Sequence, residues 1–206
     1  MAVMALTMAA MASVMTSVSM GWKQQGTTQV TYLANRQVVS RVQQLIQSAK
    51  LIGLVREGSL ASNTTSAACA VLWRCDNSGG NADRAIQFSE IGLLIHDRAT
   101  NSLKYYTVKF PSSLTPAQIT AADSAVYHYS DLTSSSAPEN FMGLNYVTAQ
   151  TVAKNVTGAA FYANQPLGQS SQFPTFEFQL AFTRNGNVSQ VYGSTALRNP
   201  DFKPTP

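Results

Sequence analysis

The chain has 206 residues, of which 45% are hydrophobic and 12% are charged, and its formal net charge is +4. This length allows one domain with an appendage, and the charged fraction is about half of the usual share. Residues 1–57 hold five basic residues and one acidic residue, which gives +4, while the remaining nine basic and nine acidic residues cancel. The basic excess is therefore local, and the composition argues against a nucleic-acid partner.

Residues 1–22, "MAVMALTMAAMASVMTSVSMGW", contain no charged residue and six of the seven methionines. A helix of this length is about 33 Å long, close to the roughly 30 Å hydrocarbon core of a bilayer. A retained membrane anchor is the preferred interpretation. A signal peptide and a buried core helix stay open, although a signal peptide needs a basic region first and no basic residue precedes Lys23.

The methionines of this segment predict one face of a helix. Met4, Met8, Met11 and Met15 recur at steps of four, three and four. Small residues separate them, which lets helix backbones approach closely in lipid, and methionine adapts to irregular neighbours. We therefore expect these four residues to pack in a membrane or at the centre of a filament.

Residues 24–52 contain no proline and carry an apolar stripe at helical spacing. Its members are Val38, Val42, Leu45, Ala49 and Ile52. Gly53 and Gly58 are candidate stop signals. The expected domains are a membrane or filament-core helix over 1–22 and, over 23–206, an amphipathic helix that continues into a β-rich globular head.

The rest of the chain predicts an antiparallel sheet. "IQFSEIGLLIHD" and "SLKYYTVKF" read as a hairpin joined by "RATN", and "TFEFQLAFTRNGNVSQVYG" reads as a second hairpin with an Asn-Gly turn. Thr115 before Pro116 predicts a capped helix. Residues 130–143 read as loop, and residues 145–163 as a strand. The predicted fold class is α+β, with a long N-terminal α-helix, apolar in its first half and amphipathic in its second, packed on an antiparallel β-sheet head.

Chemistry-bearing residues are few. If "AVLWR" is a strand, Cys69 and Cys75 stand about 20 Å apart, too far for a disulfide, so two unbridged thiols are favoured over a bridge. His96, beside Asp97, is expected in a solvated turn. Asp76, Asp83 and Glu90 are a candidate calcium set around a glycine-containing loop, but their spacing departs from that of an EF-hand, and a polar surface loop is the preferred interpretation.

The sequence resembles the type IV pilin-like proteins, most closely a type II secretion minor pseudopilin of the J kind. "MAVMALTMAAMASVM" looks like the middle of the family's N-terminal helix, and "NRQVVSRVQQLIQSAKLIG" like its amphipathic second half. The segment from "AVLWRC" to "NSLKYY" and the closing "YGSTALRNP" are similar to parts of the head. The family's basic leader, peptidase site, aromatic first residue and fifth-position glutamate do not occur, which suggests an N-terminal truncation or a start-site error.

The resemblance implies a non-enzymatic structural subunit of a pilus-like filament, as a minor or tip component. It also implies other pilin-like subunits as partners, the inner membrane as the location before assembly, and a head outside the cytoplasm. Charge bias alone would keep the side of Lys23 in the cytoplasm, and the family's orientation is preferred. The alternative function is a membrane-anchored extracytoplasmic module that binds a ligand or a protein. No cofactor is expected apart from the candidate calcium.

Overall fold

The computed structural model describes residues 2–60, 67–74, 86–164, 175–184 and 187–197, and along the first helix it describes the side chains at 15–20, 22 and 32–47. Residues 1–38 and 39–206 form two compact units. Helix α1 (Ala2–Gln47) supplies nearly all of the first unit and the first element of the second. The predicted boundary between a membrane or filament-core helix (1–22) and the rest of the chain (23–206) is a different one, and it stays a prediction.

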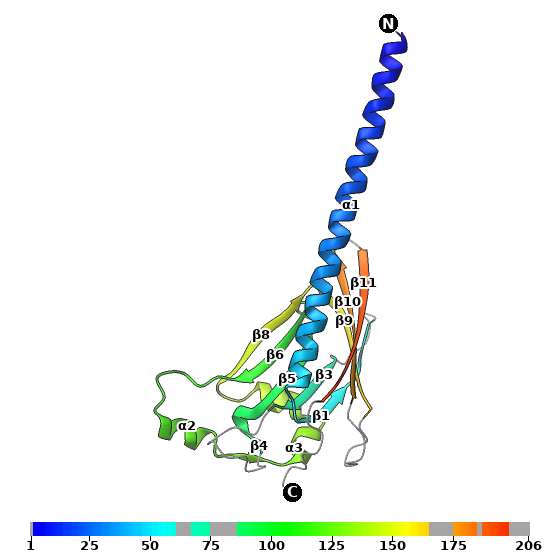
Figure 1. Cartoon of the computed structure of the whole chain (residues 1–206). Helices are drawn as coiled ribbons and strands as arrows, with labels where there is room; N and C mark the ends of the chain where they lie inside the picture. Colours follow the sequence, from blue (N-terminus) through cyan, green and yellow to red (C-terminus); the bar gives the residue numbers. More distant parts are fainter. Residues whose placement is uncertain (1, 61–66, 75–85, 165–174, 185–186, 198–206) are drawn as a thin grey trace. The chain divides into compact units, whose positions relative to one another are not determined.

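The second unit is α+β with antiparallel sheets, which confirms this part of the predicted fold class (Figure 1). A five-stranded sheet has the order β1-β3-β5-β6-β8, a four-stranded sheet has the order β11-β10-β9-β2, and β4 pairs with β7. The strands of the first sheet are β1 (Leu51–Arg56), β3 (Cys69–Trp73), β5 (Ile91–Asp97), β6 (Ser102–Val108) and β8 (Val147–Lys154). Those of the second are β2 (Gly58–Ser59), β9 (Val156–Ala163), β10 (Thr175–Arg184) and β11 (Asn187–Ala196).

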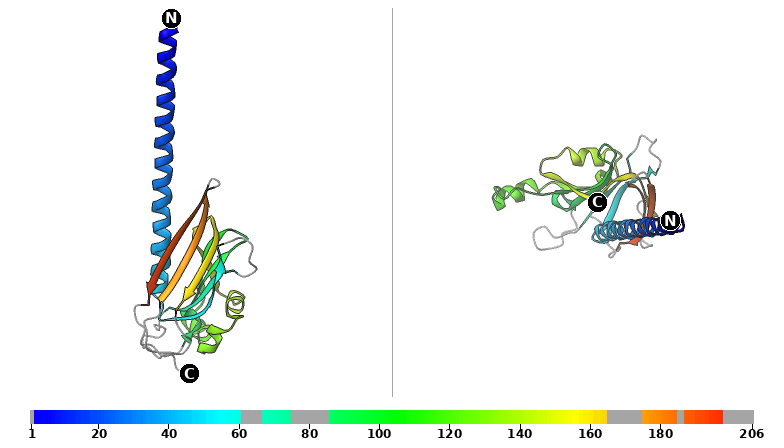
Figure 2. Two further views of the ribbon diagram at one scale, coloured as in Figure 1. Left: turned by 90° about the vertical axis from the view of Figure 1, so that its right-hand side faces the viewer. Right: turned by 90° about the horizontal axis from the view of Figure 1, so that it is seen from above.

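Both predicted hairpins are present. β5 pairs with β6, and β10 pairs with β11 from Thr175↔Ala196 to Arg184↔Asn187. In β10, Phe176, Phe178, Leu180 and Phe182 are buried, as their alternation predicts. Figure 2 shows β9, β10 and β11 side by side.

Two of the described passages between the sheets involve a residue with positive φ. Gly58 (φ 75°) follows β1 and begins β2, and Asn155 (φ 60°) separates β8 from β9. Glycine tolerates this backbone conformation freely, and asparagine does so better than most residues. Residues 145–163, predicted as one strand, are therefore two strands in different sheets.

The apolar stripe of α1 ends earlier than its spacing predicted. Val42 and Ile46 are fully buried, but α1 ends at Gln47, and Lys50 N donates to Trp73 O (2.7 Å) as β1 begins. Ile52 and Gly53 consequently lie in β1. The predicted periodicity continued beyond the helix because Ala49 and Ile52, which follow its last residue, are buried as well.

Several short elements lie outside the two larger sheets. Helix α2 (Pro116–Ala122) has the predicted Thr115 cap, whose Oγ1 accepts from Gln118 N (3.3 Å). β4 (Ile86–Gln87) and the 3-10 turn η1 (Phe88–Glu90) precede β5, where the prediction had one continuous strand. β7 (Val126–Tyr127) follows α2.

The prediction of a loop over 130–143 is wrong, because α3 (Tyr129–Thr133) and α4 (Ala137–Met142) occupy most of it. Their buried side chains join one hydrophobic cluster with the strands. This cluster includes Val71, Trp73, Ile91, Leu93, Leu132 and Phe141.

Candidate functional site

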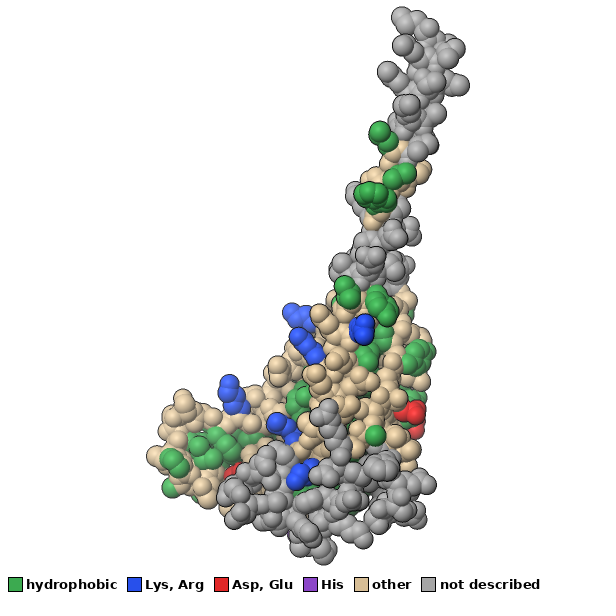
Figure 3. Space-filling view, in the orientation of Figure 1, with side chains coloured by type: hydrophobic (Ala, Val, Ile, Leu, Met, Phe, Trp, Pro, Cys, Tyr) green, Lys and Arg blue, Asp and Glu red, His purple; other side chains and the backbone are tan. Residues whose placement is uncertain are grey.

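The first candidate surface is the described stretch of α1 within the uncharged segment. Met15, Val18, Met20 and Trp22 are all exposed, with exposed fractions of 74% for Met15 and 76% for Trp22. Hydrophobic side chains also stand out on this stretch in Figure 3. A run of exposed large apolar side chains is typical of a surface that contacts a membrane or another protein.

Of the four predicted packing methionines, the structure describes the side chain of Met15 alone. Those of Met4, Met8 and Met11 lie outside the described side chains. In the part of the chain that was described, no helix combines the length and the apolar character needed to cross a membrane. The anchor assignment stays a prediction.

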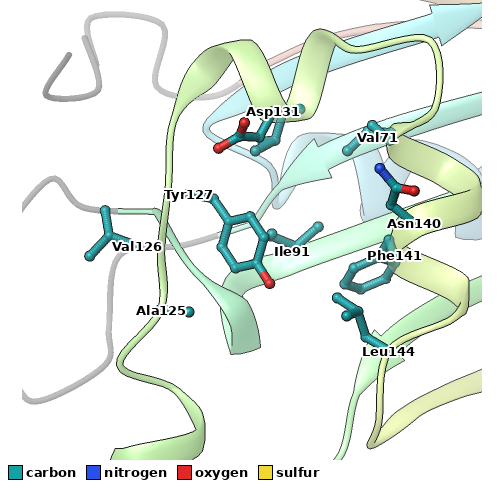
Figure 4. A pocket seen from close by; sticks show the side chains of 11 residues that line it. Val71, Ile91, Ala125, Val126, Tyr127, Asp131, Asn140, Phe141 and Leu144 are labelled. Carbon is teal, nitrogen blue, oxygen red and sulfur yellow. The ribbon is translucent and has the colours of Figure 1, made fainter.

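The second candidate site is a pocket of about 380 Å³ in the second unit (Figure 4). Val71 of β3 and Ile91 of β5 line it together with Leu132 of α3 and with Ala137 and Phe141 of α4, and all five side chains are buried. The remaining lining residues come from the segment around β7, from α3 and α4, and from the chain just after α4. They are Ala125, Val126, Tyr127, Asp131, Asn140 and Leu144.

Aromatic packing holds two walls of the pocket in place. The Phe88 ring lies 6.3 Å from that of Tyr127 in a stacked arrangement and 6.0 Å from that of Phe141 in an edge-on arrangement, measured between ring centroids. The Phe110 ring packs edge-on against the Phe88 ring, with 6.4 Å between the centroids. Such pairs add about 0.5–1.5 kcal/mol each beyond their buried area, so the pocket walls belong to the core of the unit.

Polar contacts fix the short elements around the pocket. Ser89 donates from its backbone N and from Oγ to the two carboxylate oxygens of Asp123, each at 2.7 Å, which ties the end of α2 to η1. His128 N donates to Asp131 Oδ2 (2.8 Å) at the start of α3. Arg56 pairs with Glu139 (2.9 Å) and holds α4 against β1.

The mouth of the pocket carries its polar side chains beside exposed apolar ones, whereas its base is apolar. Asp131 and Asn140 are exposed and Tyr127 is half-buried. Burial, followed by the charges of Asp131 and Asp123, raises the pKa of Tyr127, so the phenol is neutral at pH 7. This arrangement can hold an apolar body and present hydrogen-bond acceptors at one end of it.

Of the candidate calcium set, the structure describes Glu90 alone, so the set stays a prediction. Asp76 and Asp83 lie outside the described residues, and Glu90 is buried. Glu90 Oε2 accepts from Trp73 Nε1 (2.9 Å) and from Gln87 N (3.2 Å), so this carboxylate already has protein partners. No group of three potential metal ligands occurs among the residues described.

The remaining reactive side chains are buried in strands. Cys69 is a free, buried thiol in β3 whose pKa burial raises to about 11, and Cys75 lies outside the described residues. The expectation of a solvated His96 is wrong. His96 is buried next to the last residue of β5, and its Nε2 is 2.7 Å from Val156 O of the other sheet. Burial lowers its pKa, so the imidazole is neutral and serves to join the two sheets.

The pocket was missed in the sequence because its two helices were read as loop. A signal was present at the second of them: Ser136 is followed by Pro138 and Glu139 in the first turn of α4, which is the usual pattern of a helix start. Comparisons with protein-family models, with curated proteins and with solved structures give no match.

Proposed function

We propose that this chain is a structural subunit of a pilus-like filament of the type II secretion or type IV pilus kind, as a minor or tip component. The observation that carries the proposal is the uncharged stretch of α1 with Met15, Val18, Met20 and Trp22 exposed. An antiparallel α+β head follows in the same chain. A filament subunit needs both parts: a helix that packs against other helices and a head that selects neighbours.

The physical step in assembly is an exchange of environments. On this proposal, the first half of α1 sits in the inner membrane before assembly and among the helices of other pilin-like subunits afterwards, while the second half is the spine of the head. Lipid tails and apolar side chains are about equally hydrophobic, so close packing between helices decides the exchange. Alanine and serine allow close approach, and methionine fits uneven neighbours.

The test is to shear cells that produce the chain under filament-inducing conditions and to probe the released fraction. A filament subunit is expected there, together with other pilin-like proteins that copurify with it. A protein of the inner membrane that stays with the cells serves as the control for lysis. Detection of the chain solely as a monomer in the membranes of cells that release pilin-like filaments would overturn the proposal.

The pocket favours a second candidate function, a membrane-anchored extracytoplasmic module that binds a ligand or protein. Its apolar base with acceptors at the mouth is typical of ligand sites. On this alternative, the sheared fraction lacks the chain, and substitutions at the pocket change activity in the cell while those on α1 change only its retention. On the filament proposal, substitutions on α1 reduce the release of the chain by shearing, whereas substitutions at the pocket leave that release unchanged.

A further inference from the structure

We propose that the pocket between α3, α4 and β7 binds a small organic ammonium ion with an aromatic or branched apolar body. The inference is independent of the filament proposal, because it concerns only the second unit. Its volume of about 380 Å³ lies at the small end of the 300–1,000 Å³ range of ligand sites. It therefore suits one ring with a short chain.

The base of the pocket selects an apolar body. Val71, Ile91 and Phe141 are buried side chains without a polar atom, and they belong to the hydrophobic cluster of the unit. A polar group placed among them would lose its hydrogen bonds to water without replacement, which costs free energy. The charged end of a ligand must consequently lie at the mouth.

The mouth selects a cation. Asp131 is the one charged side chain among the residues described as lining the pocket. Its Oδ2 accepts from His128 N, while Oδ1 has no hydrogen-bond partner in the part of the chain that the structure describes. An ammonium group donates hydrogen bonds and carries the complementary charge, whereas a carboxylate would be repelled.

Tyr127 adds a second feature that fits an ammonium ion. Its side chain projects into the middle of the pocket in Figure 4, and its hydroxyl makes no hydrogen bond within the described residues. Asp131 and Tyr127 both line the pocket, and the negative charge of Asp131 acts on this phenol. A cation bound between them can contact both the carboxylate and the electron-rich ring.

The probes are three phenyl compounds of similar size, namely phenethylammonium, 2-phenylethanol and 3-phenylpropionate. Each is titrated into the full chain, labelled at the methyl groups of Ile, Leu and Val, and followed by NMR. We expect shifts at Ile91, Leu132 and Leu144, with Val188 on β11 as the distant control. Phenethylammonium should bind about two- to fivefold more tightly than the alcohol, as for an exposed ion pair, and the carboxylate should bind most weakly.

Two variants test the two features separately. Ala125→Phe adds a ring at the exposed mouth and should abolish the shifts, whereas Ala121→Phe, an equally exposed site on α2, should leave them unchanged. Asp131→Asn keeps an acceptor for His128 N and should remove the preference for the ammonium over the alcohol. The exposed Glu177→Gln is its charge control and should keep that preference.

Three results would overturn the proposal: equal shifts at Val188 and at the pocket methyls, unchanged binding by Ala125→Phe, or an unchanged preference in Asp131→Asn. None of these results affects the shearing experiment, which tests assembly and not the pocket. Failure of the ligand proposal and failure of the filament proposal are therefore distinguishable.

Discussion

Two stretches of the same helix meet different surroundings. Along residues 15–22 of α1, the large apolar side chains are exposed, whereas along residues 39–47 Val42 and Ile46 have exposed fractions of 0%. The second stretch is held by its own unit, where Gln43 Nε2 donates to Ser194 O and Gln47 Nε2 donates to Thr195 Oγ1, both at 3.0 Å. In the first stretch, by contrast, none of the large apolar side chains that the structure describes is buried.

The difference follows from the arrangement of the residues and not from their hydrophobicity alone. Around Val42 and Ile46 polar side chains fill the other faces of the helix, which defines one apolar stripe and so one sheet-facing side. Residues 1–22 are apolar or small on every face. A helix of that kind is stable when it is surrounded, by lipid or by other helices, and one sheet cannot cover it.

The largest effect on stability is expected from a substitution in the buried stretch of α1, residues 39–47. Ile46→Ala removes a fully buried side chain and should lower the free energy of unfolding of the second unit by about 2–5 kcal/mol. Leu33→Ala, on an exposed part of the same helix, should change it by no more than about 0.5 kcal/mol. Urea titration of both variants measures the difference, and similar losses would show that α1 does not contribute a buried stripe to this unit.

The role of the uncharged stretch, residues 1–22, is tested by placing a charge in the predicted anchor. Met11→Asp should abolish membrane retention, because a charge at mid-helix costs about 2.5–3.5 kcal/mol on insertion. Cell fractionation is the measurement. Gln37→Asp, on an exposed site of the same helix outside residues 1–22, should fractionate like the native chain. Normal retention of Met11→Asp would contradict the assignment of an anchor.

Strong periodic patterns predicted the framework of the head. The alternation in β10 and the apolar run of β5 each identified a strand, and both hairpins are present. Local patterns failed at the boundaries of these elements. The break at Asn155 depends on a single residue with positive φ, and the change from helix to strand after Gln47 lies inside one continuous apolar periodicity.

The pocket could be predicted only in part. Val71 and Ile91 were placed in strands by their patterns, but α3 and α4 are short helices in a stretch rich in serine, where propensity is weak. They are stabilised by burial of Leu132 and Phe141 against the sheet and by the Arg56–Glu139 pair, and both are contacts between distant parts of the sequence. A single sequence does not show which distant residues will meet.

A smaller effect is expected from the polar contacts of the covered stretch. Gln47→Ala removes the hydrogen bond to Thr195, whose side chain is buried, and should lower the free energy of unfolding by about 0.5–1.5 kcal/mol. Gln44→Ala, at an exposed position of the same turn, is the matched control and should have little effect. Equal values for the two variants in urea titration would mean that this hydrogen bond adds nothing to the docking of the helix.

The smallest effect is expected in the dependence of stability on pH. Residues 1–22 contain no ionisable side chain, so a dependence of stability on pH between 7 and 5 must arise elsewhere, and His96 is the buried histidine that joins the two sheets. Burial lowers its pKa in the folded state, so below the ordinary value of about 6.5 the unfolded chain binds more protons. Stability should therefore fall as the pH drops from about 6.5 towards the folded pKa.

The carboxylate next to His96 does not contribute to this dependence on pH. The ion pair with Lys104, followed by the hydrogen bond from Thr100, lowers the pKa of Asp97 to about 2, so Asp97 keeps its charge between pH 7 and 5. His96→Gln can still donate to Val156 O and should flatten the dependence, whereas His128→Gln, at an exposed helix cap, should keep it. If the acid slope of His96→Gln matched that of the native chain, the link between the sheets would not be the group that titrates, because no other change separates the two proteins.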